Sequence, residues 1–343
     1  MILFILIATA VDSSEHTETF VRSGLSPTQI ITQYYFGFIP YMWGLLFPLF
    51  VFIAVIYSTS RMAVRSEIVA ILSAGVSFNR LLRPYLIGGI ILGLLLYFSS
   101  RQIIPMGNEI RSAFHVKYID SGDPIKSGYY KNTYYRRSDT SSYVGIKDFN
   151  SAQKSAGVFF LQRIDDYEAV YNIRAESIKW DTATRKWQLT NAVERKINKD
   201  GEKVTRYPTY LLDIKIKPDE LKQDYYLKDK LTTPKLKKFI ATEELRGSEG
   251  LNTFKVERHR RTATAFSVLL LTLIGTVIAS RKTRGGSGLH IALGFIIASA
   301  FILTDRFSTT FSVKGNFPPI LAAWLPNILF AIIGLWMYRR APK

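Results

Sequence analysis

The chain contains no cysteine and only four histidines. Without cysteine it can form no disulfide, thiolate zinc site or cysteine nucleophile, and its redox compartment stays undetermined. The histidines, at positions 16, 115, 259 and 290, are too scattered to indicate a metal cluster. A phosphate-binding G-x-x-x-x-G-K-[ST] loop is also missing, because the glycine-rich segment 285–288 lacks the lysine. Any ATP that the protein uses must therefore be hydrolysed by another chain.

Charged residues are absent from five long runs, although the chain as a whole is basic. The 343 residues are 48% hydrophobic and carry a net charge of +18, with a mean hydropathy of +0.08. The uncharged runs cover residues 36–58, 85–100, 262–280, 289–304 and 315–338. A bilayer core needs about 20 helical residues, which the longer runs supply alone and the shorter ones supply with their flanks. We expect five membrane helices and a polar insert over residues 107–261.

Residues 1–11 are also apolar but too short to cross a bilayer. At about 1.5 Å per residue they reach roughly half of the hydrocarbon thickness. A signal peptide would need a basic leader, and no Lys or Arg precedes Arg22. We interpret this stretch as the outer half of a first membrane helix, and we expect a misassigned start codon or a truncated chain.

Short basic loops indicate the orientation of the helices. Segments 61–84 and 281–288 and the tail after Tyr338 are rich in Arg and Lys, whereas loop 12–35 and the turn before Pro318 have few. The positive-inside rule then places segment 61–84 in the cytoplasm and the polar insert outside.

Segment 61–84 has a helical pattern of its own. Ile68, Ile71 and Leu72 follow the spacing of one helix face, Ser66 can cap its start, and Gly75 can end it in the left-handed conformation. The pattern predicts a short amphipathic helix within residues 61–76. It can be an interfacial anchor that only reverses the chain, or a docking element for a cytoplasmic partner.

The insert is rich in β-branched and aromatic residues that partly alternate. Strands are predicted over 143–149, 158–163, 169–181, 186–197, 203–207 and 209–217, with a hairpin turn at 198–201. Such short, closely spaced strands indicate a sandwich or jelly roll. A helix over 233–246 follows, with Thr233 as its cap, Pro234 in its first turn and Leu236 on its apolar face.

The insert carries more Lys and Arg than Asp and Glu, and it ends in the basic run containing Arg258, Arg260 and Arg261. A solvated surface and helix entry explain this excess as well as an anionic, phosphate-bearing ligand does. Composition does not separate the two interpretations.

The stretch RSEIVAILSAGVSFNRLLRPYL at residues 65–86 resembles the segment between the second and third helices of the LptF/LptG (YjgP/YjgQ) permease family. These permeases are the membrane subunits of the lipopolysaccharide export ABC transporter. The likeness continues in residues 11–24, 104–105, 231–236, 257–261 and 281–288. The resemblance implies an α-helical membrane protein with an inserted jelly-roll-like periplasmic domain: helices over 1–106, the β-rich domain over 107–261, and helices over 262–343, six in all with the first truncated.

The same resemblance implies partners and a location. The family works in the bacterial inner membrane as a pair of paralogous membrane chains, LptF and LptG, bound to a cytoplasmic ABC ATPase dimer. It implies lipopolysaccharide as the substrate, a periplasmic jelly-roll protein as the bridge that receives it, and no nucleic acid. ATP would be held by the ATPase, and no cofactor is expected in this chain. Both family members share this architecture, so the sequence does not distinguish an LptF-like from an LptG-like chain.

By this resemblance residues 61–76 form the helix that couples to the ATPase. Glu67 would pair with a basic residue of that partner, and Arg61, Arg65, Ser66 and Gly75 belong to the same segment. From the residues alone, Glu67 is equally well explained as a carboxylate favoured by the dipole at a helix start.

The family's substrate cavity is bordered by the first and fifth helices. Gly294 and Ser299 give the fifth helix a small face, which permits either close packing or a gate. Arg306 at its outer end can meet a lipid phosphate, or Asp305 beside it can neutralise it. Arg258, Arg260 and Arg261 complete the candidate substrate path.

Three other classes of protein compete with this interpretation. A membrane-anchored sensor would bind a periplasmic ligand without an ATPase. An intramembrane enzyme would need ionisable groups in its spans, and the five apolar runs contain only His290. A permease of the FtsX or MacB kind places its large domain after the first of four helices, which the division into two and three secure spans disfavours.

Overall fold

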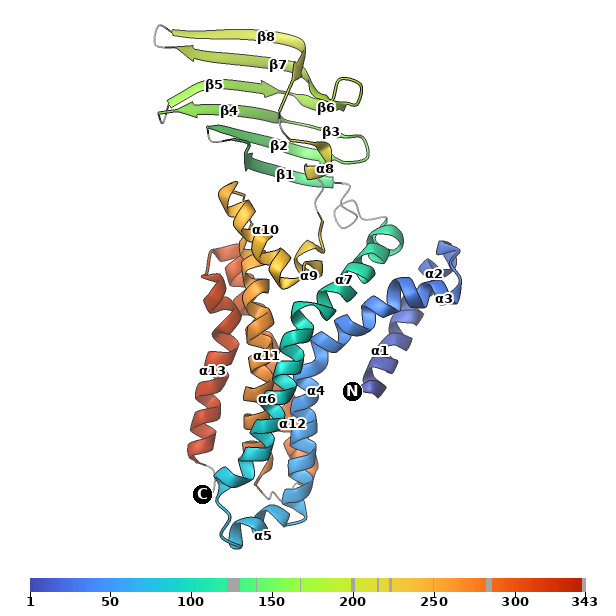
Figure 1. The fold of residues 1–343 in the computed structure, drawn as a ribbon, viewed down its shortest axis with the longest axis vertical. Coiled ribbons are helices and arrows are strands. Elements are labelled where there is room, and N and C mark those ends of the chain that lie inside the picture. Colours follow the sequence, from blue (N-terminus) through green and yellow to red (C-terminus); the bar gives the residue numbers. More distant parts are fainter. Residues whose placement is uncertain are drawn as a thin grey trace.

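The computed structural model describes residues 1–121, 130–139, 141–166, 168–198, 201–214, 216–221, 224–248, 250–281 and 286–340. An antiparallel sheet stands at one end of a helical bundle, and the short helix α5 (Glu67–Ser73) lies at the opposite end (Figure 1). We refer to these as the sheet end and the α5 end.

Five helical segments within the described ranges are long and apolar enough to cross a membrane. They are α3 (Pro27–Ile30), η1 (Ile31–Tyr35) and α4 (Phe36–Val64) in one continuous stretch, then α6 (Phe78–Arg101), α11 (Asn252–Ala279), α12 (Gly286–Gly315) and α13 (Pro319–Arg339). The five predicted spans are confirmed. Each helix extends beyond its uncharged run, and this brings charged residues into the bundle.

Helix α11 is the centre of the bundle. In its apolar window 72% of the residues are buried, against 17% to 33% in the other four spans. It packs against α4, α6, α12 and α13, and small residues permit close approach. A Cβ at Gly275 would lie 3.1 Å from the Phe52 ring of α4, and one at Gly93 of α6 would lie 3.0 Å from the Ala265 carbonyl oxygen.

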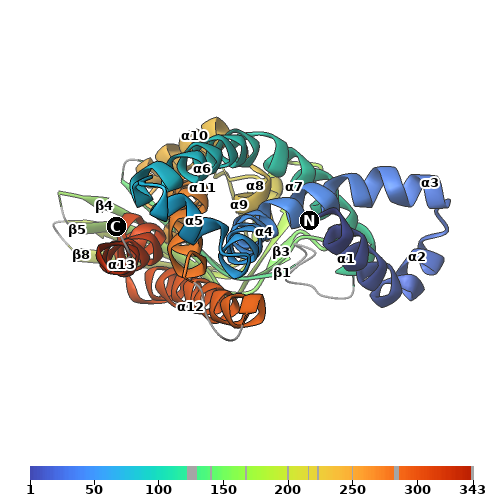
Figure 2. The same cartoon turned by 90° about the horizontal axis from the view of Figure 1, so that it is seen from below.

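The first residues form helix α1 (Ile2–Glu15), followed by α2 (Thr17–Ser23). Together with α3 they project from the bundle (Figure 2). The helix predicted over residues 1–11 is present and continues to Glu15. Its apolar side chains are largely exposed, but Phe4 packs on Phe50 of α4 with 4.9 Å between ring centroids.

The third span is followed by more helix than composition indicates. Helix α6 ends at Arg101, the backbone bends at Gln102, and α7 (Ile103–Phe114) resumes with Pro105 in its first turn. The π-helix η2 (His115–Ile119) extends it. Residues 107–119, which we assigned to the β-rich domain, are therefore a helical stalk beneath the sheet (Figure 1).

The described residues of the inserted domain form one antiparallel sheet of eight strands. They are β1 (Tyr130–Arg137), β2 (Ser142–Asn150), β3 (Ser155–Ala156), β4 (Phe159–Asp165), β5 (Glu168–Ala175), β6 (Ser177–Asp181), β7 (Lys186–Asn198) and β8 (Gly201–Leu212). Strand β2 pairs with both β3 and β4, and β7 pairs with both β5 and β6. Strands β1 and β8 each pair with a single neighbour and form the two edges.

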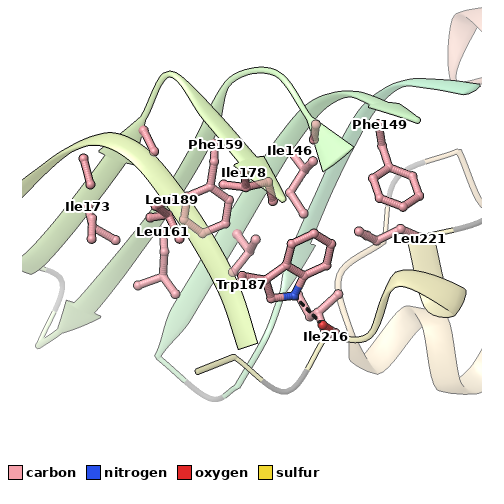
Figure 3. Close-up of a cluster of buried hydrophobic side chains, with 14 residues drawn as sticks. Ile146, Phe149, Phe159, Leu161, Ile173, Ile178, Trp187, Leu189, Ile216 and Leu221 are labelled. Carbon is pink, nitrogen blue, oxygen red and sulfur yellow. Dashed lines mark hydrogen bonds between the residues drawn. The ribbon is translucent and has the colours of Figure 1, made fainter. Parts of the chain in front are cut away.

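One face of the sheet carries the domain's core. Buried and exposed residues largely alternate along β7, and Trp187 and Leu189 are fully buried. Figure 3 shows these side chains gathered between the sheet and the segment that carries Ile216 and Leu221. The Trp187 indole donates a 2.8 Å hydrogen bond to the Ile216 carbonyl oxygen, which satisfies a buried polar group while the ring adds apolar area.

The strand predictions were wrong mainly about where one strand ends and the next begins. The single strand expected over 169–181 divides at Glu176 into β5 and β6, whereas the two expected around Pro208 form one strand, β8. Because β8 is an edge, the missing N–H of Pro208 costs no ladder bond, and Asn191 opposite it takes a φ of 52°. Strand β1 was not predicted. Residues 199 and 200 of the expected turn lie outside the described residues, but Asn198 pairs with Gly201 as a two-residue turn requires.

The chain returns to the bundle through α8 (Pro218–Leu221), α9 (Leu227–Lys230) and α10 (Thr233–Leu245). The helix expected over 233–246 is confirmed, with Leu236 and Ile240 buried, although its N-cap residue is Thr232.

Candidate functional site

Helix α5 ends in a well-formed Schellman motif. The Gly75 N–H donates to the Leu72 carbonyl oxygen at 3.0 Å, and the Val76 N–H donates to the Ile71 carbonyl oxygen at 3.3 Å. Gly75 has a φ of 83°, the left-handed conformation predicted for it. Ile71 and Val76 also supply the apolar pair that usually accompanies this motif, because both line one groove.

The start of α5 differs from the prediction. Ser66 occupies the N-cap position, but its φ is 61° and its side chain makes no capping bond to the helix. An N-cap side chain usually reaches the helix from an extended backbone. Here the chain turns sharply after α4, with the Ser66 N–H bound to the Ala63 carbonyl oxygen, so the cap geometry is not available.

One face of α5 is held on the bundle, and the other is free of it. Ile68 is buried with Phe78 and Leu82, and Ile71 and Leu72 pack on the same cluster, as their spacing predicted. Residues 67, 69, 70, 73 and 74 are exposed, including Val69 at 49%. This exposed surface combines small side chains with one carboxylate.

Four of the five predicted coupling residues, Arg61, Arg65, Ser66 and Glu67, lie where α4 turns into α5, and Gly75 lies at the far end of α5. The Glu67 carboxylate lies 3.8 Å from the Arg65 guanidinium, and both side chains are about half exposed. Arg61 is also exposed, in the last turn of α4. A long, solvated ion pair of this kind contributes little to stability, about 0–1 kcal/mol, so Glu67 can exchange Arg65 for another cation at little cost.

A cavity of about 370 Å³ lies toward the sheet end, lined by α4, α6, α7, α9, α11, α12 and α13. Leu45, Leu49 and Phe301 are among its apolar lining residues. Its charged lining residues are Asp229, Glu257, Arg260, Arg261, Asp305 and Arg306. A largely apolar wall with a charged group is the general character of a site for an amphiphile.

Two of the predicted arginines are held by the protein itself. Arg261, 6% exposed, donates to Glu257 at 3.2 Å, to the Thr233 hydroxyl at 3.1 Å and to the Lys228 carbonyl oxygen at 3.0 Å. Arg260 donates twice to the other Glu257 oxygen, at 3.0 and 2.7 Å. The basic run is therefore not a solvated helix entry: Arg261 fastens α11 to α9 and α10, and Arg260 remains at the cavity.

Arg306 differs, because its side chain is exposed and its guanidinium makes no hydrogen bond or ion pair within the described ranges. Asp305 beside it is partly buried. On α9, burial and the nearby Glu257 carboxylate raise the pKa of Asp229. Among the described lining residues three arginines are matched by three carboxylates. Arg260 and Arg261 are bound to Glu257, and Arg306, next to Asp305, is the arginine of this described set that keeps its hydrogen-bond donors for a phosphate.

Two buried asparagine side chains add hydrogen-bond acceptors to the cavity. Asn108 donates to the Asp229 carbonyl oxygen at 3.1 Å, and Asn327 donates to the Ala263 carbonyl oxygen at 2.8 Å. The side-chain oxygen of each is buried and accepts no hydrogen bond from a described residue. Both amides line the cavity, which is therefore suited to a ligand that also carries hydroxyl or amide donors.

The remaining predicted residues lie outside this cavity wall. Gly294 faces α4, where an added Cβ would lie 2.3 Å from the Ile56 Cδ1, so the small face of α12 is used for packing at this point. Ser299 is half-buried beside Ala298, which does line the cavity. Arg258 lies 3.1 Å from the His259 ring nitrogen and does not reach the cavity.

The five apolar runs hold no ionisable group except His290, as stated above, but the folded helices that contain these runs hold more. Helices α11 and α12 continue past their apolar runs and carry Glu257, Arg260, Arg261, Asp305 and Arg306. Sequence reasoning also missed Asn327, a polar residue within the last apolar run, and Asp229, which only the fold brings to the bundle. An amide in an otherwise apolar span is a usable signal.

The described ranges hold five membrane-length helices, divided two and three by a β-sheet domain, and these define a polytopic membrane protein with an inserted extramembrane domain. A comparison with protein-family models matches residues 1–340 to the family described as lipopolysaccharide export system permease LptF/LptG. The chain belongs to this family. It is an inner-membrane permease for lipopolysaccharide export, a transport subunit rather than an enzyme. No curated protein matches the chain in a direct sequence comparison.

Proposed function

We propose that this chain is the membrane subunit of an ATP-driven exporter that extracts lipopolysaccharide from the inner membrane and passes it to a periplasmic bridge protein. The observation that carries the proposal is the family match over residues 1–340, which includes the α5 turn, the cavity and the sheet domain together. In this proposal the chain works with a paralogous membrane chain, and ATP is bound and hydrolysed by a cytoplasmic ATPase dimer.

The distribution of charge supports an orientation with α5 in the cytoplasm and the sheet in the periplasm. Arg61, Arg65 and Arg80 lie at the α5 end, and Arg340 at the end of α13 joins them. The Arg281 guanidinium donates to the Arg340 carbonyl oxygen, and Tyr338 donates to Asn79, so these loops share one end. Short basic loops stay on the cytoplasmic side, whereas a long insert can be translocated despite its charge.

The shape of α5 supports its role as the coupling element. One face is packed on α4 and α6, so a push on the helix is transmitted to two spans, and its exposed face offers Glu67 among small side chains. Within the part of the chain that the structure describes, the weak Arg65 contact is the one ion pair that Glu67 has to give up. In the proposed complex Glu67 pairs with a basic residue of the ATPase and fixes the register of docking.

The cavity supports an amphiphilic substrate. Its apolar wall suits acyl chains, its orphan amide oxygens suit sugar hydroxyls, and Arg306 suits a phosphate. Helix α12 continues the apolar surface outward through the exposed Phe295 and Phe307. Closure of the ATPase would squeeze this chamber and move the lipid toward the sheet domain, whose own core is apolar.

Replacing Glu67 by Gln or Lys tests the coupling role. We expect ATP hydrolysis by the assembled complex to persist while lipopolysaccharide release per ATP falls at least about ten-fold, because one lost charge-assisted bond is worth roughly 1.5–3 kcal/mol. Glu18→Gln is the matched control: Glu18 is another exposed carboxylate paired with an arginine, Arg22, but it lies on α2 at the other end. Normal export in both Glu67 variants would refute the coupling role.

A further inference from the structure

The first two turns of α10 carry three exposed lysines, Lys235, Lys237 and Lys238, which we call the α10 lysine cluster. Leu236 and Ile240 are buried and hold the other side of the helix against the protein. The three lysines therefore keep a defined place on the outer surface of the chain. None of the three is among the residues that line the charged cavity.

The protein does not neutralise this cluster. Within the described ranges, none of the three ammonium groups forms an ion pair or a hydrogen bond. The carboxylates of α10 lie at its other end, where Glu243 is 2.8 Å from Arg246 and Glu244 is 2.7 Å from Lys255. The helix dipole is positive at the start of α10 and disfavours cations there. An anion from outside the chain would offset both effects.

Two contacts place the start of α10 at the depth where α6 ends. Arg261 of α11 donates to the Thr233 hydroxyl at 3.1 Å, so α10 begins beside Arg261. A Cβ at Gly93 of α6 would lie 3.0 Å from the Ala265 carbonyl oxygen, so Gly93 and Ala265 share one depth. At about 1.5 Å per residue, Arg101 lies about 12 Å beyond Gly93 toward the sheet end, and Arg261 about 6 Å beyond Ala265. The lysine cluster, which follows Thr233 by two to five residues, therefore lies near the depth of Arg101.

Arg101 marks the surface of the membrane on this side. It is the first charged residue after the uncharged run 85–100, and its guanidinium lies 4.9 Å from the centroid of the Tyr97 ring. A tyrosine and an arginine at the end of a span are typical of the membrane interface. The other end of α10 leads to the sheet (Figure 1), where the Arg137 N–H of β1 donates to the Arg246 carbonyl oxygen at 3.2 Å. The lysine cluster is therefore at the level of the lipid headgroups.

We propose that the α10 lysine cluster binds the phosphates of anionic phospholipids in the leaflet on the sheet side of the membrane. Lysine stems lie along apolar surface while their ammonium groups reach the headgroups, and each cation near an anionic surface adds to the attraction. Lipopolysaccharide also carries phosphates, but the cavity proposed for it does not include the cluster. Lipid binding here does not depend on the export function. Because α10 contacts β1, the bound lipid would help to fix the sheet domain relative to the membrane.

The test uses the purified full chain in phosphatidylcholine vesicles that contain a phosphatidylglycerol with a diazirine next to its headgroup, or the matching phosphatidylcholine probe. We expect phosphatidylglycerol to label segment 233–246 at least about five-fold more than phosphatidylcholine, since one lysine near an anionic headgroup accounts for that ratio. The triple variant Lys235→Gln, Lys237→Gln, Lys238→Gln should remove this preference, and arginine at the same three positions should keep it. Raising the salt concentration should weaken the preference in the unaltered chain.

The matched control is the triple variant Lys179→Gln, Lys186→Gln, Lys203→Gln, which removes three exposed lysines from the sheet domain. It should leave the labelling of α10 unchanged, and an equal loss in this variant would refute a local site. Equal labelling by the two probes, or a preference that survives the loss of all three α10 lysines, would also overturn the proposal. So would stronger displacement of the probe by lipopolysaccharide than by unlabelled phosphatidylglycerol, or loss of labelling when a second membrane chain is added.

Discussion

Arg261 and Arg306 carry the same side chain and line the same cavity, yet their surroundings give them different tasks. Arg261 is buried and bound to Glu257, Thr233 and the Lys228 carbonyl oxygen. Arg306 is exposed and has no such partner within the described residues. Removing one partner of a buried charged network leaves other groups unsatisfied, whereas removing a solvated charge does not.

We expect Arg261→Met to lower the free energy of unfolding by about 3 kcal/mol, and Arg306→Met to change it by no more than about 0.5 kcal/mol. Arg306→Met should instead weaken lipopolysaccharide binding several-fold, since a phosphate loses a charge-assisted bond. Unfolding in one detergent and binding of labelled lipopolysaccharide measure the two effects. A reversed pattern, with Arg261 dispensable for stability, would contradict these assignments.

His115 lies in a cluster that joins the stalk to the N-terminal helices. Its Nδ1 is 3.6 Å from the Asp120 carboxylate, which accepts a 2.7 Å hydrogen bond from Tyr226, and its ring lies 6.2 Å from that of His16. Burial, followed by the positive charge of Arg111, lowers the pKa of His115 to about 4. The folded protein therefore holds this imidazole neutral.

This pKa predicts acid sensitivity. Because the pKa in the unfolded chain is about 6.5, the unfolded chain takes up the proton first as the pH falls. Above pH 6.5 this imidazole costs the folded protein nothing. Between about pH 6.5 and 4 the free energy of unfolding falls, by a total on the order of 1–3 kcal/mol. His115→Gln should make the fall in Tm between pH 7 and pH 5 smaller. An unchanged pH dependence in that variant would show that other groups cause it.

At the element scale, the contact between α4 and α12 depends on Gly294. An added Cβ would lie 2.3 Å from the Ile56 Cδ1, and Ile56 is buried in the core that α4 and α12 share with α11 and α13. Close packing of this kind leaves no room for a larger residue unless its partner shrinks.

Gly294→Val should destabilise the chain by about 1–3 kcal/mol, and Ile56→Ala alone by about 2–5 kcal/mol. The double variant should lose at least about 1 kcal/mol less unfolding free energy than the two single losses added together, because the smaller residue at position 56 makes room for the larger one at position 294. Thermal unfolding of the four proteins measures this coupling energy. Gly288→Val, at an open helical glycine, controls for the backbone effect, and strict additivity would mean that the two helices do not touch there.

Single helices and strands also show what sequence patterns can predict. The apolar face of α5 and the left-handed Gly75 follow from local spacing and backbone freedom, and both predictions are confirmed. The prediction that the Ser66 side chain caps α5 was wrong, because the turn out of α4 imposes a positive φ on that residue. Strand β8 was divided at Pro208 because only the finished sheet makes it an edge.

At the scale of the whole molecule, the division into membrane helices and an inserted β domain was predictable because uncharged runs and alternating strands are local features. The cavity was not, because it joins residues from distant segments such as Asp229, Arg260 and Arg306. Spacing cannot show that Glu257 holds two arginines and leaves a third free. The Arg-rich run could be predicted as a candidate, but the role of each arginine depends on tertiary contacts.

The most direct test of the central claim is transport by the assembled complex. The chain, its paralogous membrane partner and the ATPase would be reconstituted in proteoliposomes with labelled lipopolysaccharide, and transfer to a soluble jelly-roll acceptor would be measured. We predict transfer that requires hydrolysable ATP and falls to background without this chain. Transfer at the same rate without ATP or without this chain, or no transfer when every component is present and hydrolysing ATP, would contradict the account.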